Sequence, residues 1–207
     1  MYMLVDIFSG LIVPLAIVIL YCVIKKVNVK KSVLLILFSI YVVAVLDVVG
    51  VPYIQTAHWN PVLNLVPFSD LVKNGKTSLN VFQFTANIIM LVPFGFFVPL
   101  IWKSLRKLYA TAVAGFLFSL GIEAAQLFSP RVTASDDVIL NTLGALVGYV
   151  VAAVIFHRSW KKEARVTKQT RSRDYVELAV LILLALVTTV LFKYAIGSWL
   201  YSTPLFK

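Results

Sequence analysis

The sequence has little cysteine and little histidine, and each shortage excludes a class of site. Only one cysteine, Cys22, occurs in 207 residues, which excludes an internal disulfide and a zinc site built on cysteines. The two histidines, His58 and His157, fall in links that we predict to lie on opposite sides of a membrane. No glycine-rich phosphate loop, nucleophile elbow or zinc-binding motif is present. We therefore expect no cofactor and no metal site, and neither ATP hydrolysis nor serine–histidine–aspartate chemistry.

Charge is also scarce. Charged residues make up 14% of the sequence and hydrophobic residues 60%, whereas a soluble domain carries about 25% charged residues. Several apolar runs reach about 18 residues, which is enough to cross the hydrocarbon core of a bilayer. The net charge of +10 then bears on orientation and anionic lipid, because no basic face interleaved with aromatic residues suggests a nucleic-acid partner. The composition predicts an all-α integral membrane protein, with residues 1–207 forming a single polytopic domain.

Six transmembrane helices are predicted, and the basic residues orient them. The links after the first, third and fifth helices hold 14 of the 19 lysines and arginines. Because basic residues concentrate in cytoplasmic links, these three links are predicted to be cytoplasmic and both termini to lie outside. Segment 157–174 is predicted to be a basic cytoplasmic loop that contacts anionic lipid. The predicted helices span residues 7–24, 32–50, 82–101, 109–128, 138–156 and 176–196.

Polar side chains recur at one depth near the outer ends of four predicted helices. They are Asp47, Asn87, Glu123 and Asn141, about 5–8 Å below the outer boundary at the helical rise per residue. A polar or ionisable side chain inside hydrocarbon is costly and usually serves a function. Their common level predicts a single site, although Asp47, close to its helix end, has the alternative of extending toward water.

The spacing of small residues predicts which helices carry this site together. Two stripes at intervals of three or four residues each place polar and small residues on one helix face, and small residues let membrane helices approach closely. We therefore expect the fourth and fifth helices to pack together, with Glu123 facing Asp137 and Asn141. In the alternative interpretation the small residues only pack, and the amide only joins helices. The stripes are Thr111, Gly115, Ser119 and Glu123, and Asp137, Asn141, Gly144, Gly148 and Ala152.

The residue types suggest roles within the site. If the protein makes or breaks bonds, Glu123 and Asp137 are the candidate catalytic residues, because carboxyl groups serve as general acids and bases. Recognition without catalysis is equally compatible with these residues. An arginine suits an anionic headgroup, although a loop arginine can also simply neutralise nearby aspartates. The candidate substrate-binding residues are Asn87, Gln126, Arg131, Asp136 and Asn141.

Five motifs, in this order, resemble the VanZ-like family over residues 60–155. The resemblance implies a multi-pass protein of the plasma membrane of Gram-positive bacteria, associated with the cell envelope. The family takes its name from a protein that gives low-level resistance to the antibiotic teicoplanin, a lipoglycopeptide. Family members often carry a further aspartate where this chain has Ala134, which argues against a metal held by three aspartates. The motifs are Asn64-Leu65-Val66-Pro67-Phe68, Asn87 followed by Pro93-Phe94-Gly95, Glu123-Ala124-Ala125-Gln126, Arg131 with Asp136-Asp137, and Asn141-Thr142-Leu143-Gly144 with Gly148.

Three functions are compatible with these features. The first is an outward-facing intramembrane site that recognises or modifies the headgroup of a lipid-linked cell-envelope molecule, or a lipoglycopeptide. The second is a non-catalytic structural or partner-binding membrane protein. The third is a small proton-coupled transporter with Glu123 as its proton site. Transport is disfavoured because the third predicted helix has no polar side chain from Ile88 to Leu100.

Overall fold

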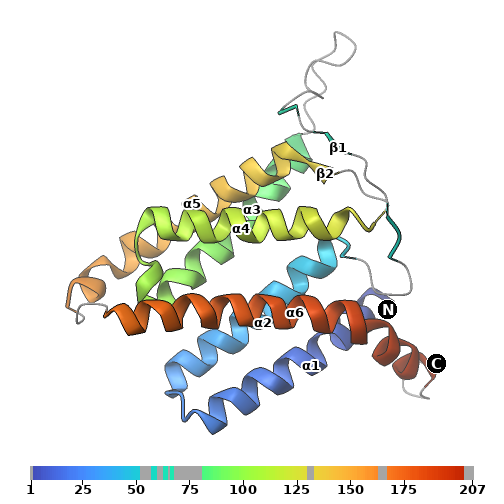
Figure 1. The fold of residues 1–207 in the computed structure, drawn as a ribbon, viewed down its shortest axis with the longest axis horizontal. Coiled ribbons are helices and arrows are strands. Elements are labelled where there is room, and N and C mark those ends of the chain that lie inside the picture. Colours follow the sequence, from blue (N-terminus) through green and yellow to red (C-terminus); the bar gives the residue numbers. More distant parts are fainter. Residues whose placement is uncertain are drawn as a thin grey trace. The chain divides into compact units, whose positions relative to one another are not determined.

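The computed structural model describes residues 2–51, 57–59, 63, 64, 66, 67, 81–129, 133–162 and 167–202. This part of the chain is helical (Figure 1), which confirms the predicted all-α class. A short 3₁₀ helix, η3 (Lys103–Leu105), follows α3, and two strands of two residues each, β1 (Leu63–Asn64) and β2 (Thr133–Ala134), pair in parallel. The α-helices are α1 (Tyr2–Ile24), α2 (Val29–Val48), α3 (Val81–Ile101), α4 (Leu108–Gln126), α5 (Ser135–Lys162) and α6 (Lys168–Ser202).

Length and side-chain exposure both indicate a membrane protein. Among the described residues, α2 to α6 each hold a stretch long and apolar enough to cross a membrane, and α1 holds the shorter apolar stretch Gly10–Ile24. Large apolar side chains are exposed on these helices, among them Val154 (76% exposed) and Ile89 (61%). Soluble monomers rarely expose continuous apolar surface, whereas a helix in lipid presents it. The chain is therefore an all-α membrane protein.

The chain divides into two compact units. One unit consists of Met1–His58 and Val176–Lys207, and the other of Trp59–Tyr175. The first unit thus holds α1, α2 and most of α6, and the second holds the first residues of α6 together with α3, α4, α5 and the strand pair.

Hydrogen bonds join the helices of the first unit near the turn between α1 and α2. The side chain of Asn28 accepts a hydrogen bond from the backbone N–H of Lys31 at 2.9 Å and so caps α2. Glu177 of α6 accepts hydrogen bonds from the Tyr21 hydroxyl (2.9 Å) and from Lys31 Nζ (2.7 Å). These contacts hold the end of α1, the start of α2 and α6 together.

The closest helix packing in the second unit is between α3 and α5. A Cβ atom added to Gly144 or Gly148 would come within 3.0 Å of the backbone of Ile88 or Val92, closer than real Cβ atoms approach. The fourth helix was the predicted partner of this face of α5. That prediction holds for Asn141, which bonds to Ser119 of α4, but it is wrong for Gly144 and Gly148, which lie against α3. The spacing shows which face of α5 carries small residues. It does not show which neighbouring helix brings its backbone against that face, and in the structure this helix is α3.

Helix α4 packs on this pair through aromatic side chains. Phe94 of α3 and Phe118 of α4 stack with ring centroids 4.9 Å apart and an interplanar angle of 9°. Both side chains are buried, and α3 continues as one helix through Pro93 and Pro99. The stacked rings lie within the three-helix core, which fixes α3, α4 and α5 relative to one another.

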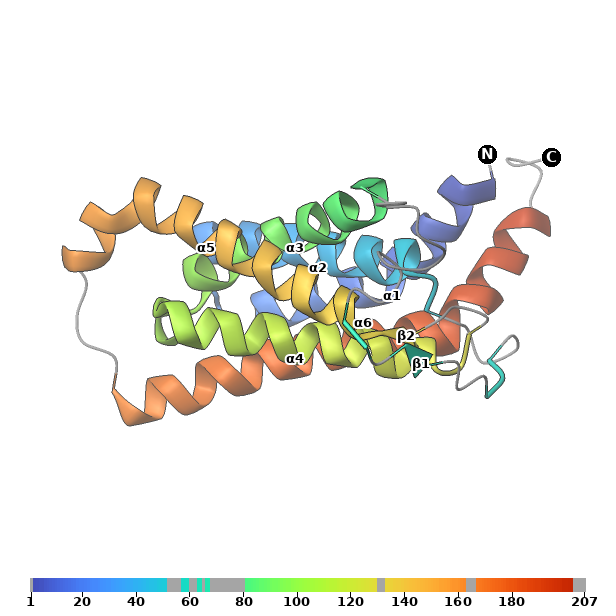
Figure 2. The same ribbon diagram turned by 90° about the horizontal axis from the view of Figure 1, so that it is seen from above.

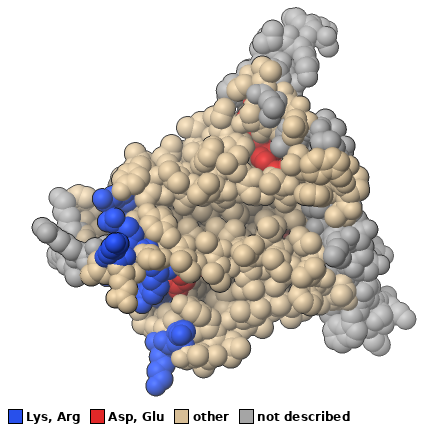
Figure 3. All heavy atoms as spheres, in the orientation of Figure 1, with Lys and Arg blue, Asp and Glu red and all other residues tan. Residues whose placement is uncertain are grey.

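The basic turns of the second unit lie where α3 ends and α4 begins. Arg106 Nε donates a hydrogen bond to the carbonyl of Pro99 at 3.1 Å, and the Tyr149 hydroxyl of α5 donates to the carbonyl of Arg106 at 2.8 Å. In the space-filling view, lysine and arginine side chains are visible on the left, the side on which Figure 1 shows α3 passing into α4 (Figure 3). The start of α3, the end of α4 and the start of α5 form the opposite end of this unit.

The segment predicted to be a basic loop, 157–174, is helical on both sides of residues 163–166. Helix α5 continues to Lys162, and α6 begins at Lys168. Lysine, arginine and glutamine favour helix, so both helices continue past the apolar stretches that the sequence marks.

Asp174, at the start of α6, is predicted to contribute to stability. Its buried carboxylate accepts hydrogen bonds from the backbone N–H (3.0 Å) and the hydroxyl (2.7 Å) of Ser104. Removing the acceptor with Asp174→Ala is expected to cost about 1–3 kcal/mol, because it leaves buried donors unsatisfied. Thermal unfolding of the purified protein in detergent measures the loss. Asp174→Asn, which keeps an acceptor oxygen, should unfold close to wild type, and equal stability of the alanine variant would contradict the assignment.

Candidate functional site

Three helices bring predicted site residues to one end of the second unit. Asn87 lies near the start of α3, Glu123 near the end of α4, and Asp137 and Asn141 in the first two turns of α5. This end is opposite to the basic turns. We refer to these four residues as the polar cluster.

Glu123 is buried (5% exposed), and the short strand pair holds its carboxylate. The backbone N–H of Ala134 in β2 donates a hydrogen bond to Glu123 Oε2 at 3.1 Å. Ala134 in turn pairs with Asn64 of β1. Figure 2 shows both strands beside the end of α4 and the start of α5. Asn64, which begins the first of the family-like motifs, therefore pairs with the residue that binds Glu123, although it is far away in the chain.

Asp137 connects the other two helices of the cluster. Asn87 Nδ2 of α3 donates a hydrogen bond to Asp137 Oδ1, and the carboxyl groups of Asp137 and Glu123 interact electrostatically. The structure thus brings Glu123 and Asp137 together, as the helix faces suggest. The specific bond between Asn87 and Asp137 was not predicted, because depth alone does not tell which side chains pair.

Asn141 lies about one helical turn deeper and is 1% exposed. Its Nδ2 donates a hydrogen bond to the Ser119 hydroxyl of α4 at 2.9 Å. Its Oδ1 has no hydrogen-bond partner among the described residues, and a buried acceptor without a partner is costly. Because Asn141 follows Asp137 by four residues and Ser119 precedes Glu123 by four, this pair forms the floor of the polar cluster.

The other predicted site residues have different positions. Gln126 and Asp136 are both buried, at 5% exposure each. Asp136 lies with Asp137 in the first turn of α5, where negative charge also stabilises the helix N-terminus. Arg131 lies outside the described residues, and Asp47 belongs to the first unit.

Aromatic residues border this end of the unit. The rings of Trp59 and Phe128 meet edge to face with centroids 5.4 Å apart. Such amphipathic rings are typical of the membrane–water interface.

Two groups of the site were not predicted from the sequence, the Ser119 hydroxyl and the backbone N–H of Ala134. Ser119 belongs to the predicted stripe of small residues, which was the only signal for it. A backbone donor such as the Ala134 N–H has no sequence signature.

Chemically, the cluster offers hydrogen-bond acceptors and an amide donor. Two carboxylates and a buried amide oxygen can accept hydrogen bonds, and the amide of Asn87 can donate them. No group of three or more histidine, cysteine, aspartate or glutamate side chains within the described ranges is arranged to hold a metal ion.

Comparison with known proteins places these features in a family. The model of the VanZ/LLP1 family matches residues 38–157, which is more than half of the chain and includes the whole polar cluster. No curated protein and no solved structure matches the chain. The resemblance of the sequence motifs is thus confirmed over a longer segment than 60–155, and this chain belongs to the VanZ/LLP1 family.

Proposed function

We propose that this VanZ-like protein is a multi-pass protein of the bacterial plasma membrane whose polar cluster recognises, and can modify, a lipid-linked headgroup of the cell envelope. A lipoglycopeptide such as teicoplanin, which carries both a lipid chain and polar groups, belongs to the same ligand class. The observation that supports this most is that Glu123 and Asp137, from two helices, lie at one end of the second unit and interact electrostatically.

The orientation of the protein in the membrane follows from the position of its basic residues. Most of the basic residues of this unit adjoin the end of α3, the start of α4, the end of α5 and the start of α6, and basic links remain in the cytoplasm. The cluster at the opposite end then faces outward, with both termini outside as well. An outward site a few ångströms below the interface is within reach of a headgroup whose chain stays in the bilayer.

The chemistry of the cluster fits a headgroup rich in hydroxyl and amide groups. Glu123 and Asp137 accept hydrogen bonds, Asn87 holds Asp137 in place, and Asn141 offers its remaining acceptor at the floor of the cluster. If a bond is broken, Glu123 and Asp137 supply an acid and a base in the same place. Gln126, Asp136 and Arg131 are further proposed binding residues.

A second candidate function is structural. It is favoured by the internal hydrogen bonds of Asn87 to Asp137 and of Asn141 to Ser119, which link α5 to both neighbours. In this alternative the polar cluster only fixes the helices, and the protein acts through another surface.

The recognition function is tested with two isosteric variants. Expression of the wild-type protein in a teicoplanin-sensitive Gram-positive host is expected to raise the inhibitory concentration of teicoplanin. Glu123→Gln and Asp137→Asn should each return it to the level of the empty vector at unchanged protein abundance in the membrane. Both variants keep the shape of the side chain but remove its charge.

The matched controls lie outside the cluster. Glu177→Gln and Asp174→Asn make the same chemical changes at a salt bridge in the first unit and at a structural acceptor of the second. Both controls should retain wild-type resistance. Full resistance in Glu123→Gln and Asp137→Asn would reject the proposed site.

A further inference from the structure

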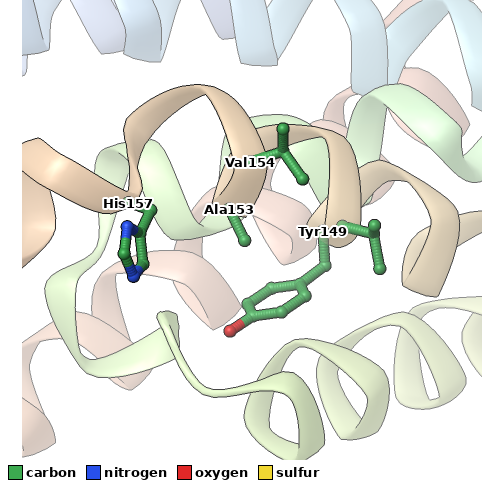
Figure 4. A pocket seen from close by; sticks show the side chains of 5 residues that line it. Tyr149, Ala153, Val154 and His157 are labelled. Carbon is green, nitrogen blue, oxygen red and sulfur yellow. The ribbon is translucent and has the colours of Figure 1, made fainter.

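A groove with a volume of about 340 Å³ runs along α5, toward the end that carries the basic turns. Its lining is Tyr149, Val150, Ala153, Val154 and His157. Tyr149, Ala153 and His157 follow at four-residue intervals, so they form a row along one helix face. Figure 4 shows Tyr149 and His157 at the two ends of this row with Ala153 between them. The groove is therefore an apolar track that ends in an imidazole.

Two arginines lie near this track. Arg158 follows His157 directly. The Tyr149 hydroxyl donates to the carbonyl of Arg106, and the Arg106 guanidinium lies 5.2 Å from the centre of the Trp160 ring. The rings of Trp160 and Tyr149 are 6.2 Å apart. Tyrosine, tryptophan and arginine together are typical of the boundary between hydrocarbon and water.

We propose that this groove binds an anionic phospholipid. One acyl chain lies along α5 between Tyr149 and His157, and the phosphate lies beside His157 and Arg158. The basic turn that contains Arg106 supplies additional positive charge. This is a second site of the protein, at the opposite end of the unit from the polar cluster, and it does not depend on the proposed function of that cluster.

Exposure and charge favour lipid over a protein partner. Val150 (52% exposed) and Val154 (76%) project from a helix long enough to span a membrane, so their surroundings are acyl chains. A headgroup with net negative charge gains from each nearby lysine or arginine, whereas a zwitterionic headgroup gains much less. In this proposal the groove contacts the acyl chain of the lipid, and the basic residues select a negatively charged headgroup.

Selective retention of phosphatidylglycerol over phosphatidylcholine tests the proposal. The full-length protein is purified in detergent, and its affinities for the two lipids with identical chains are measured by native mass spectrometry. Phosphatidylglycerol is expected to bind more tightly. Arg158→Gln should weaken phosphatidylglycerol binding about fivefold and leave phosphatidylcholine unchanged, because one basic residue near the surface contributes on that order. Val154→Trp, which fills the groove, should weaken both lipids.

Two control variants separate the site from general effects. Lys25→Gln removes a basic residue in the first unit, and Val113→Trp adds the same bulk at another exposed position, on α4. Neither variant should change the affinity for either lipid. Equal binding of the two lipids to the wild-type protein, or equal losses in Arg158→Gln and Lys25→Gln, would overturn the proposal. Gel filtration of each variant verifies that the compared proteins are folded.

Discussion

Replacing Gly148 with alanine is expected to lower the stability of this protein substantially. An added Cβ would meet the backbone of Val92 and Phe96 within 3.0 Å, and backbone atoms of a packed helix cannot rotate away as a side chain can. Overpacking of this kind costs about 1–3 kcal/mol or more. Because Gly144 has the same relation to Ile88, the double variant Gly144→Ala/Gly148→Ala should fail to yield folded protein.

A glycine in the same bundle provides the matched control. Gly121 of α4 has no atom within 4 Å of the position that its Cβ would occupy. Gly121→Ala should therefore leave stability unchanged or raise it, since alanine is favoured over glycine by about 1 kcal/mol in a helix interior. Unfolding by increasing denaturant in mixed micelles measures all variants. Wild-type stability of Gly148→Ala would show that α3 and α5 are not in backbone contact.

This contact also illustrates how far sequence reasoning extends for the fold. Apolar runs correctly predicted the number and order of the α-helices in the described part of the chain, because a chain in lipid must satisfy its backbone hydrogen bonds within each helix. The ends were predicted less well. The fifth helix was predicted at 138–156 and is found at Ser135–Lys162, because hydropathy marks the part of a helix inside hydrocarbon, while helical hydrogen bonding continues into polar residues.

The candidate site was partly predictable for a related reason. Helix periodicity placed Glu123 near Asp137, since a shared face and a shared depth leave little freedom. The partner of Asp137 from α3 and the backbone donor of Ala134 were not predictable. Both depend on how the helices are rotated relative to one another and on a two-residue strand pair, and neither leaves a repeating pattern in the sequence.

The largest functional effect is expected from replacing both partners of the pair between α3 and α5. Asn87→Leu alone leaves the half-buried carboxylate of Asp137 without its amide donor, which is expected to cost about 1–3 kcal/mol or more. Adding Asp137→Leu removes the carboxylate as well, and two apolar side chains of similar size can pack where the hydrogen bond was. The double variant should therefore recover most of the stability that the single variant loses.

Resistance should not recover with stability, and this difference separates the two candidate functions. If the polar cluster only joins helices, the double variant is both stable and active, because packing replaces the hydrogen bond. If the cluster recognises a headgroup, the double variant is stable and inactive, because leucine cannot accept a hydrogen bond from the ligand. Stability is measured by thermal unfolding in detergent, and activity by the inhibitory concentration of teicoplanin in the host strain. A stable double variant with wild-type resistance would leave the structural function as the better account of the cluster, since no headgroup contact through Asp137 would then be needed.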